Sequence, residues 1–351
     1  WLIMKKTIAA CIAATFAVTY SSTALAEEAF MAPLVEQSVL LDIDANSFVV
    51  IVGERGHVLL SEDGKSFHQK LVPTQSTLTA TTVVGENIWA VGHDAVILHS
   101  SDKGETWEIQ NYQPDLQRPF LDVLFFDEKQ GIATGAYGLF YRTLDGGKTW
   151  TAERHASLLD PMDQEYLEEI RKEDEDFYQQ ELESILPHLN RVTLDGDTLY
   201  MAGEAGLLAK STNMGESWER YYVDYTGSFF DIKPLDESTV LAVGLRGNIF
   251  VNRNQGEWEY VQTCSTSTLN SILVGSESKI YALGNNGMMV SAQRPLPTSM
   301  RDPYANPSDC EADEGIEVSQ IKDKAALLNA TQFNGISIAV SANGIKTLNL
   351  K

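Results

Sequence analysis

Carboxylates recur in this chain inside one short pattern, and carboxylates at a fixed spacing could serve as general acids or bases. The pattern Ser/Thr-x-Asp-x-Gly-x-Thr-Trp is complete in Ser100–Trp107 and Thr143–Trp150, has Asn in place of Asp in Ser211–Trp218, and is shortened in Ser61–Phe67. A fifth, more degenerate copy is Asn252–Trp258. An active site is needed once, whereas this pattern returns along the chain. We therefore expect structural turns and assign no catalytic residue.

The pattern has a clear structural use as a tight turn between two strands. The Asp or Asn side chain accepts hydrogen bonds from nearby backbone amides, the Gly supplies a positive φ, and the aromatic ring packs over the turn. The residues that we expect to act in this way are Ser61, Asp63, Ser100, Asp102, Gly104, Trp107, Thr143, Asp145, Gly147, Trp150, Ser211, Asn213, Gly215 and Trp218.

A second recurring pattern, Gly-x-x-Gly between two apolar runs, organises the chain. Its first glycines are Gly53, Gly92, Gly135, Gly203, Gly244 and Gly284, and Val340–Gly344 is a weaker seventh copy. Most copies are about 40 residues apart, and the runs alternate apolar and polar residues as strands do. Four short strands per unit are typical of a propeller blade. The sequence therefore predicts an all-β, seven-bladed propeller, with six blades as the alternative count.

The rest of the chain offers little for cofactor or metal chemistry. No glycine-rich phosphate loop stands out, since each Gly-x-x-Gly joins strand to strand with no helix after it, and no metal-spaced His/Cys cluster is apparent. Cys264 and Cys310 are too few for a structural zinc site, but an oxidising compartment would let them form a disulfide. We expect no cofactor and no metal, and either a Cys264–Cys310 bridge or two free thiols.

The first 26 residues are expected to be a targeting segment that includes an extension of three residues ahead of the start methionine. A basic pair, Lys5–Lys6, is followed by an apolar run up to Tyr20 and by small residues up to Ala26, as in a signal peptide cleaved after Ala26. Cys11 lies inside the apolar run, so no lipid anchor is expected. The pattern predicts a periplasmic or secreted protein with one propeller domain over residues 27–351. An uncleaved N-terminal anchor is the alternative.

The charge balance excludes two classes of partner. The 351 residues include 49 acidic and 26 basic side chains, for a net charge of −23. Sequence-independent binding of nucleic acid needs a basic surface, and anionic lipid repels an acidic one. We expect a monomer that binds a protein partner and no nucleic acid.

The combination of Gly-x-x-Gly with an Asp-containing box in one repeat resembles the Asp-box (BNR) propellers. More specifically, it resembles the photosystem II stability and assembly factor family and its relatives in non-photosynthetic bacteria, from about Leu41 to Leu350. The resemblance implies a non-catalytic seven-bladed propeller that binds protein partners and helps to assemble a membrane-protein complex. Photosynthetic members are implied to dock through an arginine-rich patch, whereas this chain has 11 arginines and is acidic. A different, basic partner, such as an envelope transporter or exporter, fits the chain better.

The order of the patterns within a blade predicts which face docks. With strands a to d counted from the axis, Gly-x-x-Gly joins b to c and the box joins c to d, so the two patterns lie on opposite faces. Insertions at about 151–189 and 293–332 are expected as d-to-a linkers on the b–c face. The first is predicted to be an acidic helix over Asp163–Leu186, either a solvated cap or a partner-binding element. We expect Phe333–Leu350 to close the ring by pairing with a strand within Phe30–Leu41.

Two sets of polar side chains are expected on the b–c face or at the axis. A recurring set at the start of strand a should cap backbone groups at the axis: Asp122, Asp231, Asn270 and Asn334. The side chains that do not recur are the candidates for binding a partner: Arg55, His93, Arg118, Tyr137, Glu204 and Arg246.

Two other functions remain open. A sialidase-like glycoside hydrolase needs three arginines around a carboxylate, a Tyr–Glu pair and an Asp acid, for which the chain offers Arg55, Arg118, Arg246, Tyr137, Glu204 and either Asp122 or Asp231. The Phe/Tyr-Arg-Ile-Pro segment that accompanies the first sialidase arginine is missing from the sequence. A lectin-like propeller that binds sugar is the other alternative.

Overall fold

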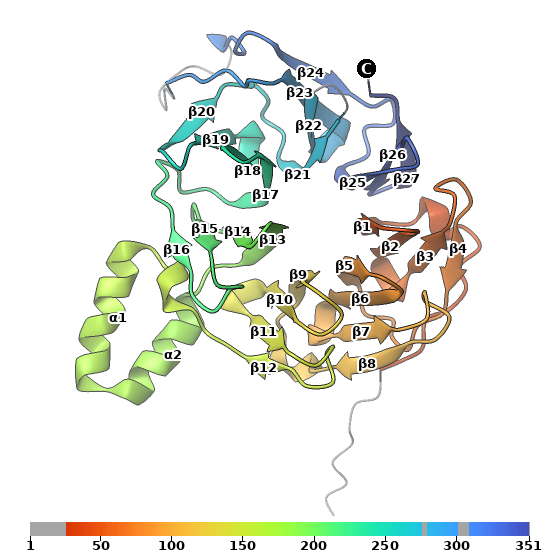
Figure 1. Ribbon diagram of the computed structural model, residues 1–351, viewed down its shortest axis with the longest axis horizontal. Helices are drawn as coiled ribbons and strands as arrows, with labels where there is room; N and C mark the ends of the chain where they lie inside the picture. The colour runs from red at the N-terminus through yellow and green to blue at the C-terminus, as the bar shows by residue number, and fades with distance from the viewer. Residues whose placement is uncertain (1–25, 276–278, 301–308, 351) are drawn as a thin grey trace, which may run out of the picture.

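The computed structural model describes residues 26–275, 279–300 and 309–350, whose strands form seven antiparallel sheets in a ring around a central axis (Figure 1). The predicted seven-bladed propeller is confirmed. The six-bladed alternative is wrong, because the weak seventh repeat forms a sheet of its own. The signal peptide was predicted over residues that lie, up to residue 25, outside the described part of the chain.

The first three blades each have four strands, in sequence order from the axis to the rim. Blade one comprises β1 (Leu40–Ala45), β2 (Val49–Gly53), β3 (Val58–Ser61) and β4 (His68–Lys70). Blade two comprises β5 (Leu78–Val84), β6 (Asn87–Gly92), β7 (Ile97–Ser100) and β8 (Glu108–Asn111). Blade three comprises β9 (Phe120–Phe125), β10 (Gly131–Gly135), β11 (Phe140–Thr143) and β12 (Thr151–Ala152).

The next three blades repeat this order, and the last described sheet has three strands. Blade four comprises β13 (Leu189–Asp195), β14 (Thr198–Gly203), β15 (Leu208–Ser211) and β16 (Glu219–Arg220). Blade five comprises β17 (Phe229–Asp236), β18 (Thr239–Gly244), β19 (Ile249–Arg253) and β20 (Trp258–Val261). Blade six comprises β21 (Leu269–Val274), β22 (Lys279–Gly284), β23 (Met288–Gln293) and β24 (Ile316–Gln320), and blade seven comprises β25 (Leu327–Phe333), β26 (Ile336–Ser341) and β27 (Gly344–Leu348).

The first glycine of each Gly-x-x-Gly turn lets the b–c turn close against the start of its own blade. In blade one, the backbone N–H of Glu54 donates to the carbonyl of Val39 at 3.0 Å. A Cβ on Gly53 would lie 2.3 Å from that same carbonyl oxygen, so any larger residue would push the turn away. Five of these turns are 3₁₀ helices: η2 (Glu54–Gly56), η3 (His93–Ala95), η5 (Ala136–Gly138), η7 (Leu245–Gly247) and η9 (Asn285–Gly287).

The polar side chains of the inner strands join each blade to the next. Carboxylates accept backbone N–H groups of the following blade, as in Thr81 N to Asp42 at 2.9 Å and Val192 N to Asp122 at 2.6 Å. The junction between blades seven and one is closed by the amide of Asn329, which donates to Asp42 at 2.6 Å. At three of the remaining four junctions, a side chain donates to a backbone carbonyl of the next blade: Thr79 to Phe120, Asn190 to Phe229, and Asn270 to Leu327. At the fourth, the carboxylate of Asp231 accepts the backbone N–H of Ile272.

The predicted capping of backbone groups at the axis is confirmed for Asp122, Asp231 and Asn270. It is wrong for Asn334, which lies in the turn between β25 and β26 with φ 48°. Blade seven begins six residues earlier than the prediction assumed, at Leu327, so Asn329 takes the axial position.

The prediction of ring closure by an N-terminal strand is wrong for the described residues. The segment before β1 bonds to the rim of blade one, through Ala29 N to the carbonyl of Val72 at 2.9 Å, and then forms the 3₁₀ turn η1 (Val35–Gln37). It therefore adds no strand to blade seven, whose sheet ends at β27. Apolar packing closes the ring instead, where Leu40 and Ile43 of blade one share a buried cluster with Ile338 of blade seven.

The two insertions differ from each other in position. The first lies between blades three and four, as predicted, but it contains two helices, α1 (Pro161–Glu173) and α2 (Glu175–Ile185), in place of one. The short turn η6 (Ala156–Leu158) precedes them. Asp174 ends α1 and caps α2 by accepting the N–H of Phe177 at 2.9 Å, which bends the segment into a hairpin beside the ring (Figure 1).

The second insertion is not the linker between blades six and seven that the sequence predicted. β24 pairs with β23 as the fourth strand of blade six, so the extra residues 294–315 join strand c to strand d. The insertion therefore starts on the face of the boxes, opposite the first insertion, and then follows the outer strand of blade five, where Ser299 N donates to Tyr260 O at 2.8 Å.

No helix among the described residues combines the length and the apolar character needed to cross a membrane.

The second glycine of a b–c turn offers a test of this architecture. Gly206 has φ +69°, and a Cβ there would lie 2.0 Å from the carbonyl oxygen of Tyr225. Gly196 also has a positive φ, +57°, but a Cβ there would meet nothing within 4 Å. We predict that Gly206→Ala lowers the free energy of unfolding by about 3 kcal/mol, and that Gly196→Ala lowers it by only about 1 kcal/mol. Urea denaturation measures both. Equal losses would contradict the close approach.

Candidate functional site

The six side chains predicted to bind a partner all lie on the b–c face, meaning the face that carries the b–c turns. Arg55, His93 and Arg246 stand exposed on turns of blades one, two and five. None of these three forms a side-chain hydrogen bond or ion pair with another residue in the described part of the chain. The structure brings only Arg118, Tyr137 and Glu204 together, at the junction of blades three and four.

These three residues and His188 form a connected group, which we call the blade 3–4 cluster. The guanidinium of Arg118 lies over the ring of Tyr137, 5.7 Å from its centroid. The rings of Tyr137 and His188 pack edge to face, with 4.5 Å between their centroids. The backbone N–H of Tyr137 donates to Nδ1 of His188 at 2.9 Å, which places the imidazole proton on Nε2. That nitrogen faces the carboxylate of Glu204 at 3.9 Å.

Local backbone geometry exposes the centre of the cluster. Tyr137 occupies the tip of η5 with φ 53°, and its side chain is 49% exposed. The backbone of His188 is held by Glu204 on both sides, since His188 N donates to the Glu204 carboxylate at 3.3 Å and Glu204 N donates to the His188 carbonyl at 2.9 Å. An exposed aromatic ring on a fixed backbone with an arginine beside it is the composition of a protein-binding hot spot.

The helical hairpin is fastened to this cluster. Glu183 of α2 pairs with Arg118 at 3.4 Å and with Arg154 at 3.0 Å. Leu186, just after α2, packs against Gly138 so closely that a Cβ on this glycine would lie 2.4 Å from the Leu186 Cβ. The hairpin also has a small apolar core of its own around Leu167, Tyr178 and Leu182. The cluster and the hairpin therefore form one continuous surface on the b–c face.

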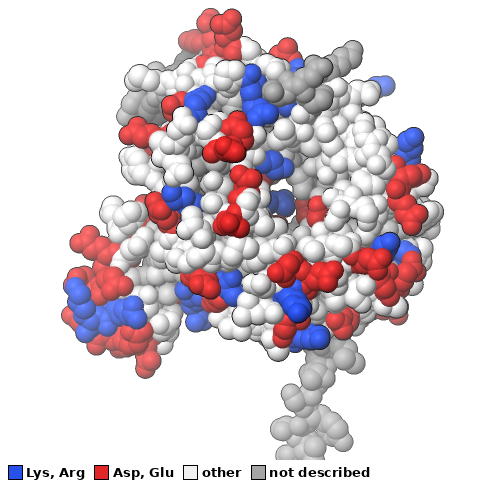
Figure 2. Space-filling model, viewed as in Figure 1, with Lys and Arg blue, Asp and Glu red and all other residues white. Residues whose placement is uncertain are grey.

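The hairpin gives that surface a strong negative charge. Between Asp163 and Leu186 the sequence contains ten acids and two bases. In Figure 2 these charged side chains gather on the hairpin, which projects from the ring. The acidic helical segment was predicted from the sequence, whereas its fold into a hairpin and its contact with Arg118 were not.

The axis holds a second group of charges around a cavity of about 280 Å³. Arg191 of β13 contacts Asp122 of blade three at 3.2 Å and Asp42 of blade one at 3.5 Å, so one cation compensates two buried carboxylates across the axis. Burial raises the pKa of Asp44 to about 6, although the N–H groups of Val83 and Ala45 act in the opposite direction.

The arrangement required for sialidase chemistry is not assembled around this cavity. The arginine lining it is Arg191, which is engaged by carboxylates, and not Arg55, Arg118 or Arg246. Of those three, Arg118 touches Tyr137, but both lie on the b–c face beside the hairpin. Within the described ranges, no group of three or more His, Cys, Asp or Glu residues is placed to hold a metal ion.

The box residues lie in the c–d turns on the opposite face, which we call the box face. In blade two, Asp102 accepts the backbone N–H of Thr106 at 2.9 Å and its hydroxyl at 2.6 Å, and Ser100 accepts the N–H of Gly104 at 2.8 Å. These hydrogen bonds, led by that of the Thr106 hydroxyl, lower the pKa of Asp102 to about 2. The same contacts recur around Asp63, Asp145 and Asn213, so these polar groups are used within their own turns.

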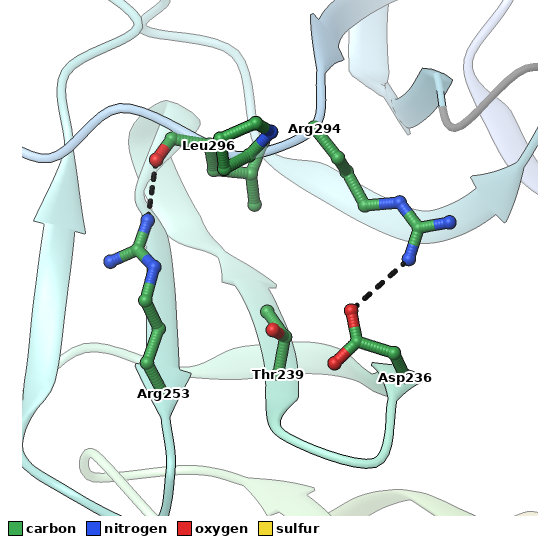
Figure 3. A pocket seen from close by; sticks show the side chains of 6 residues that line it. Asp236, Thr239, Arg253, Arg294 and Leu296 are labelled. Carbon is green, nitrogen blue, oxygen red and sulfur yellow. Dashed lines mark hydrogen bonds and ion pairs between the residues drawn. The ribbon is translucent and has the colours of Figure 1, made fainter.

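Two arginines attach the second insertion to the box face of blade five. Arg253 donates to the carbonyl of Leu296, and Arg294 lies 3.4 Å from Asp236 (Figure 3). A pocket of about 400 Å³ remains between them. Further along, Cys264 and Cys310 are placed as a disulfide with their Cα atoms 5.8 Å apart.

Sequence reasoning missed several residues of these sites, among them Asp42, His188, Arg191 and Asn329. Arg191 and Asn329 occupy the same strand position as Asp42 and Asp122, two residues after the apolar residue that opens strand a. The residue type at this position varies from blade to blade, so recurrence of one type could not reveal it. His188 follows Pro187 directly after the hairpin. This place, where the insertion rejoins the propeller, is the one sequence feature that could have indicated His188 as a site residue.

Comparison with known proteins places the fold beside one family. The profile of the family described as "Photosynthesis system II assembly factor YCF48" matches residues 28–153. A photosystem II assembly lipoprotein Ycf48 from Prochlorococcus marinus is 25% identical over 185 residues, which cover 46% of this chain and 54% of that protein. The corresponding lipoprotein from a Synechococcus species is 25% identical over 185 residues, covering 52% of this chain and 48% of its own length. The chain thus spans about half the length of the curated relatives it matches.

Solved structures agree on the fold. A structure described as "YCF48 bound to D1 peptide" superposes with a TM-score of 0.61 at 13% identity, covering 92% of this chain and 98% of that chain. YCF48 from Cyanidioschyzon merolae superposes with a TM-score of 0.62 at 16% identity and with the same coverage. BamB from Moraxella catarrhalis superposes with a TM-score of 0.53 at 15% identity, covering 88% of this chain and 82% of that chain. The predicted resemblance to the photosystem II assembly factor family is confirmed.

The axial charges give a first prediction for this site. Arg191→Met would leave Asp42 and Asp122 buried without their cation, so we predict a loss of about 3 kcal/mol in the free energy of unfolding. Arg246→Met removes an exposed arginine and should change it by less than about 0.5 kcal/mol. Adding Asp42→Asn and Asp122→Asn to Arg191→Met should restore part of the loss. Equal effects of the two Met variants in urea denaturation would contradict this account.

The raised pKa of Asp44 gives a second prediction. Its folded-state pKa of about 6 exceeds the ordinary value of 3.8, so the folded protein binds more protons than the unfolded chain between pH 4 and 6. Stability should therefore fall as the pH rises through this range. Relative to Asp44→Asn, which does not titrate, the wild-type protein should lose about 2 to 3 kcal/mol between pH 4 and 7. Denaturant unfolding of both proteins at several pH values measures the difference, and a constant difference would contradict the prediction.

Proposed function

We propose that this chain is a non-catalytic periplasmic propeller that binds a protein partner and supports the assembly or stability of a membrane-protein complex, such as an envelope transporter or exporter. The observation that carries the proposal is the blade 3–4 cluster with the hairpin fastened to it. An exposed Tyr137, a flanking Arg118 and a rigid backbone form a surface suited to protein recognition. The Asp and Asn side chains of the boxes, in contrast, are used in their own turns.

The similar proteins support a binding role. The matching family is described as an assembly factor, the curated relatives are assembly lipoproteins, and one structure of the same fold is described as bound to a D1 peptide. These names describe the relatives and not this chain. Because the sequence identity is low, we infer the partner of this chain from the chemistry of its own surface. That chemistry differs from an arginine-rich patch, because the b–c face carries the acidic hairpin.

The proposed location follows from the N-terminal pattern and the cysteines. A basic pair, an apolar run and small residues up to Ala26 are the pattern of an export signal. Disulfides persist in oxidising compartments, and Cys264 lies against Cys310. Both observations favour the periplasm or the exterior over the cytosol.

A matched pair of variants tests the proposal. Tyr137→Ala removes the exposed ring of the cluster, and Leu144→Ala removes an apolar side chain that is 66% exposed in a box turn of the same blade. We predict that an affinity-tagged wild-type chain co-purifies a defined envelope complex. Tyr137→Ala should reduce its recovery by about tenfold, as expected for a hot-spot residue, while Leu144→Ala should leave it unchanged.

The readout is quantitative mass spectrometry of material solubilised from envelope membranes. Recovery of no specific complex by the wild-type chain would contradict the proposed function. Equal recovery by both variants would contradict the assignment of the binding surface to the b–c face.

A further inference from the structure

One face of helix α1 exposes apolar side chains that the rest of the described chain does not cover. Met162 is 79% exposed and Tyr166 is 50% exposed. They are four residues apart, so they lie one above the other on the same side of the helix. The next residue, Leu167, points away from Tyr166 by about 100° around the helix and is buried in the core of the hairpin, so the exposed pair is not part of that core.

The outer edge of blade four lies beside the start of the hairpin. Arg220 of β16 donates to the carbonyl of Leu158 at 2.6 Å, directly before α1, and β16 lies beside the start of α1 in Figure 1. Two residues after Arg220 comes Tyr222, which is 85% exposed. We call the exposed face of α1 around Met162 and Tyr166, beside this edge of blade four, the hairpin corner.

The negative charges around the hairpin corner indicate what kind of molecule can bind there. Glu165 and Glu173 lie on α1 with exposed side chains beside the face of Met162 and Tyr166, within the segment that has ten acids and two bases. A second copy of this chain would bring the same negative charge, and a membrane of anionic lipid would repel it. A cationic surface with an apolar stripe complements both the charge and the exposed side chains.

We propose that the hairpin corner binds a Lys/Arg-rich amphipathic helix of the partner protein. The pair Met162 and Tyr166 offers apolar contacts one helical turn apart, which matches the spacing of anchor residues on a helix laid along α1. The flanking carboxylates bind the cationic groups beside those anchors. This inference rests on the proposed function and names the chemistry of the partner segment that the b–c face accepts.

A synthetic peptide replaces the unidentified partner in the test. The probe is a fluorescein-labelled 18-residue helix of Lys and Leu with its leucines on one face, and its counterpart has Glu in place of every Lys. Fluorescence anisotropy with the full chain in 50 mM salt should show binding of the Lys/Leu peptide at least tenfold tighter than that of the Glu/Leu peptide. Met162→Ser with Tyr166→Ser should weaken it about fivefold or more, because the apolar contacts are lost.

Charge variants at two places separate a local site from bulk attraction. Glu165→Gln/Glu173→Gln should weaken binding several-fold, and this effect should shrink in 500 mM salt. The matched control, Glu62→Gln/Glu216→Gln, removes two exposed acids from the turns of the box face and should change binding by less than twofold. All substituted side chains are exposed, and thermal unfolding by circular dichroism checks that each variant is folded.

Three results would overturn the inference: similar affinity for the two peptides, equal weakening by the two charge variants, or unchanged affinity in the Met162/Tyr166 variant. If the peptide test fails but an envelope complex still co-purifies in a way that depends on Tyr137, the proposed function stands and only the binding of a basic helix is wrong. Failure of that co-purification would instead remove the proposed function itself.

Discussion

The ring depends on hydrogen bonds from side chains of the inner strands to the neighbouring blade. Each of the seven junctions has one, and the last of them joins Asn329 to Asp42, which also accepts the N–H of Thr81 on its other side. Carboxylates satisfy buried N–H groups well, but several of them converge at the axis and repel one another. Arg191 resolves this conflict by contacting Asp42 and Asp122 together. The cavity at the axis is therefore stabilised by a structural ion network, which leaves recognition to the faces.

The ring is closed by hydrogen bonds near the axis and by apolar packing between blades one and seven, so the outer parts of the blades can carry insertions. The ring does not rely on a strand exchanged between the chain ends within the described residues, because blades one and seven share a buried cluster. Each blade can then accept an insertion at its rim without disturbing its neighbours. The hairpin uses this freedom on the b–c face, and residues 294–300 use it on the box face and along blade five. The two insertions give the faces different chemistry on a ring that is otherwise repetitive.

Much of the fold could be predicted from the sequence because its determinants are local and repeated. The glycines of the b–c turns and the Asp side chains of the boxes act within a few residues of their own positions, so they leave a pattern that recurs in each blade. Arg191 and Asn329 left no such pattern, because they compensate groups that are distant in sequence. The place of the second insertion was also mispredicted: nothing local in Ile316–Gln320 shows that it pairs with β23. For the candidate site, Arg118, Tyr137 and Glu204 were predictable from the sequence, whereas His188 and the grouping of these residues were not. The grouping depends on contacts between distant residues, such as that of Glu183 with Arg118, 65 residues away.

We propose that the partner binds the b–c face at the blade 3–4 cluster and the hairpin, and not the box face. Site-specific photo-crosslinking in intact cells tests it most directly, with a photoreactive amino acid placed at Tyr137, at Tyr166 or, on the box face, at Leu144. We predict that positions 137 and 166 crosslink to the same envelope protein, whereas position 144 does not. Crosslinking from position 144 alone, or equally from all three positions, would contradict it.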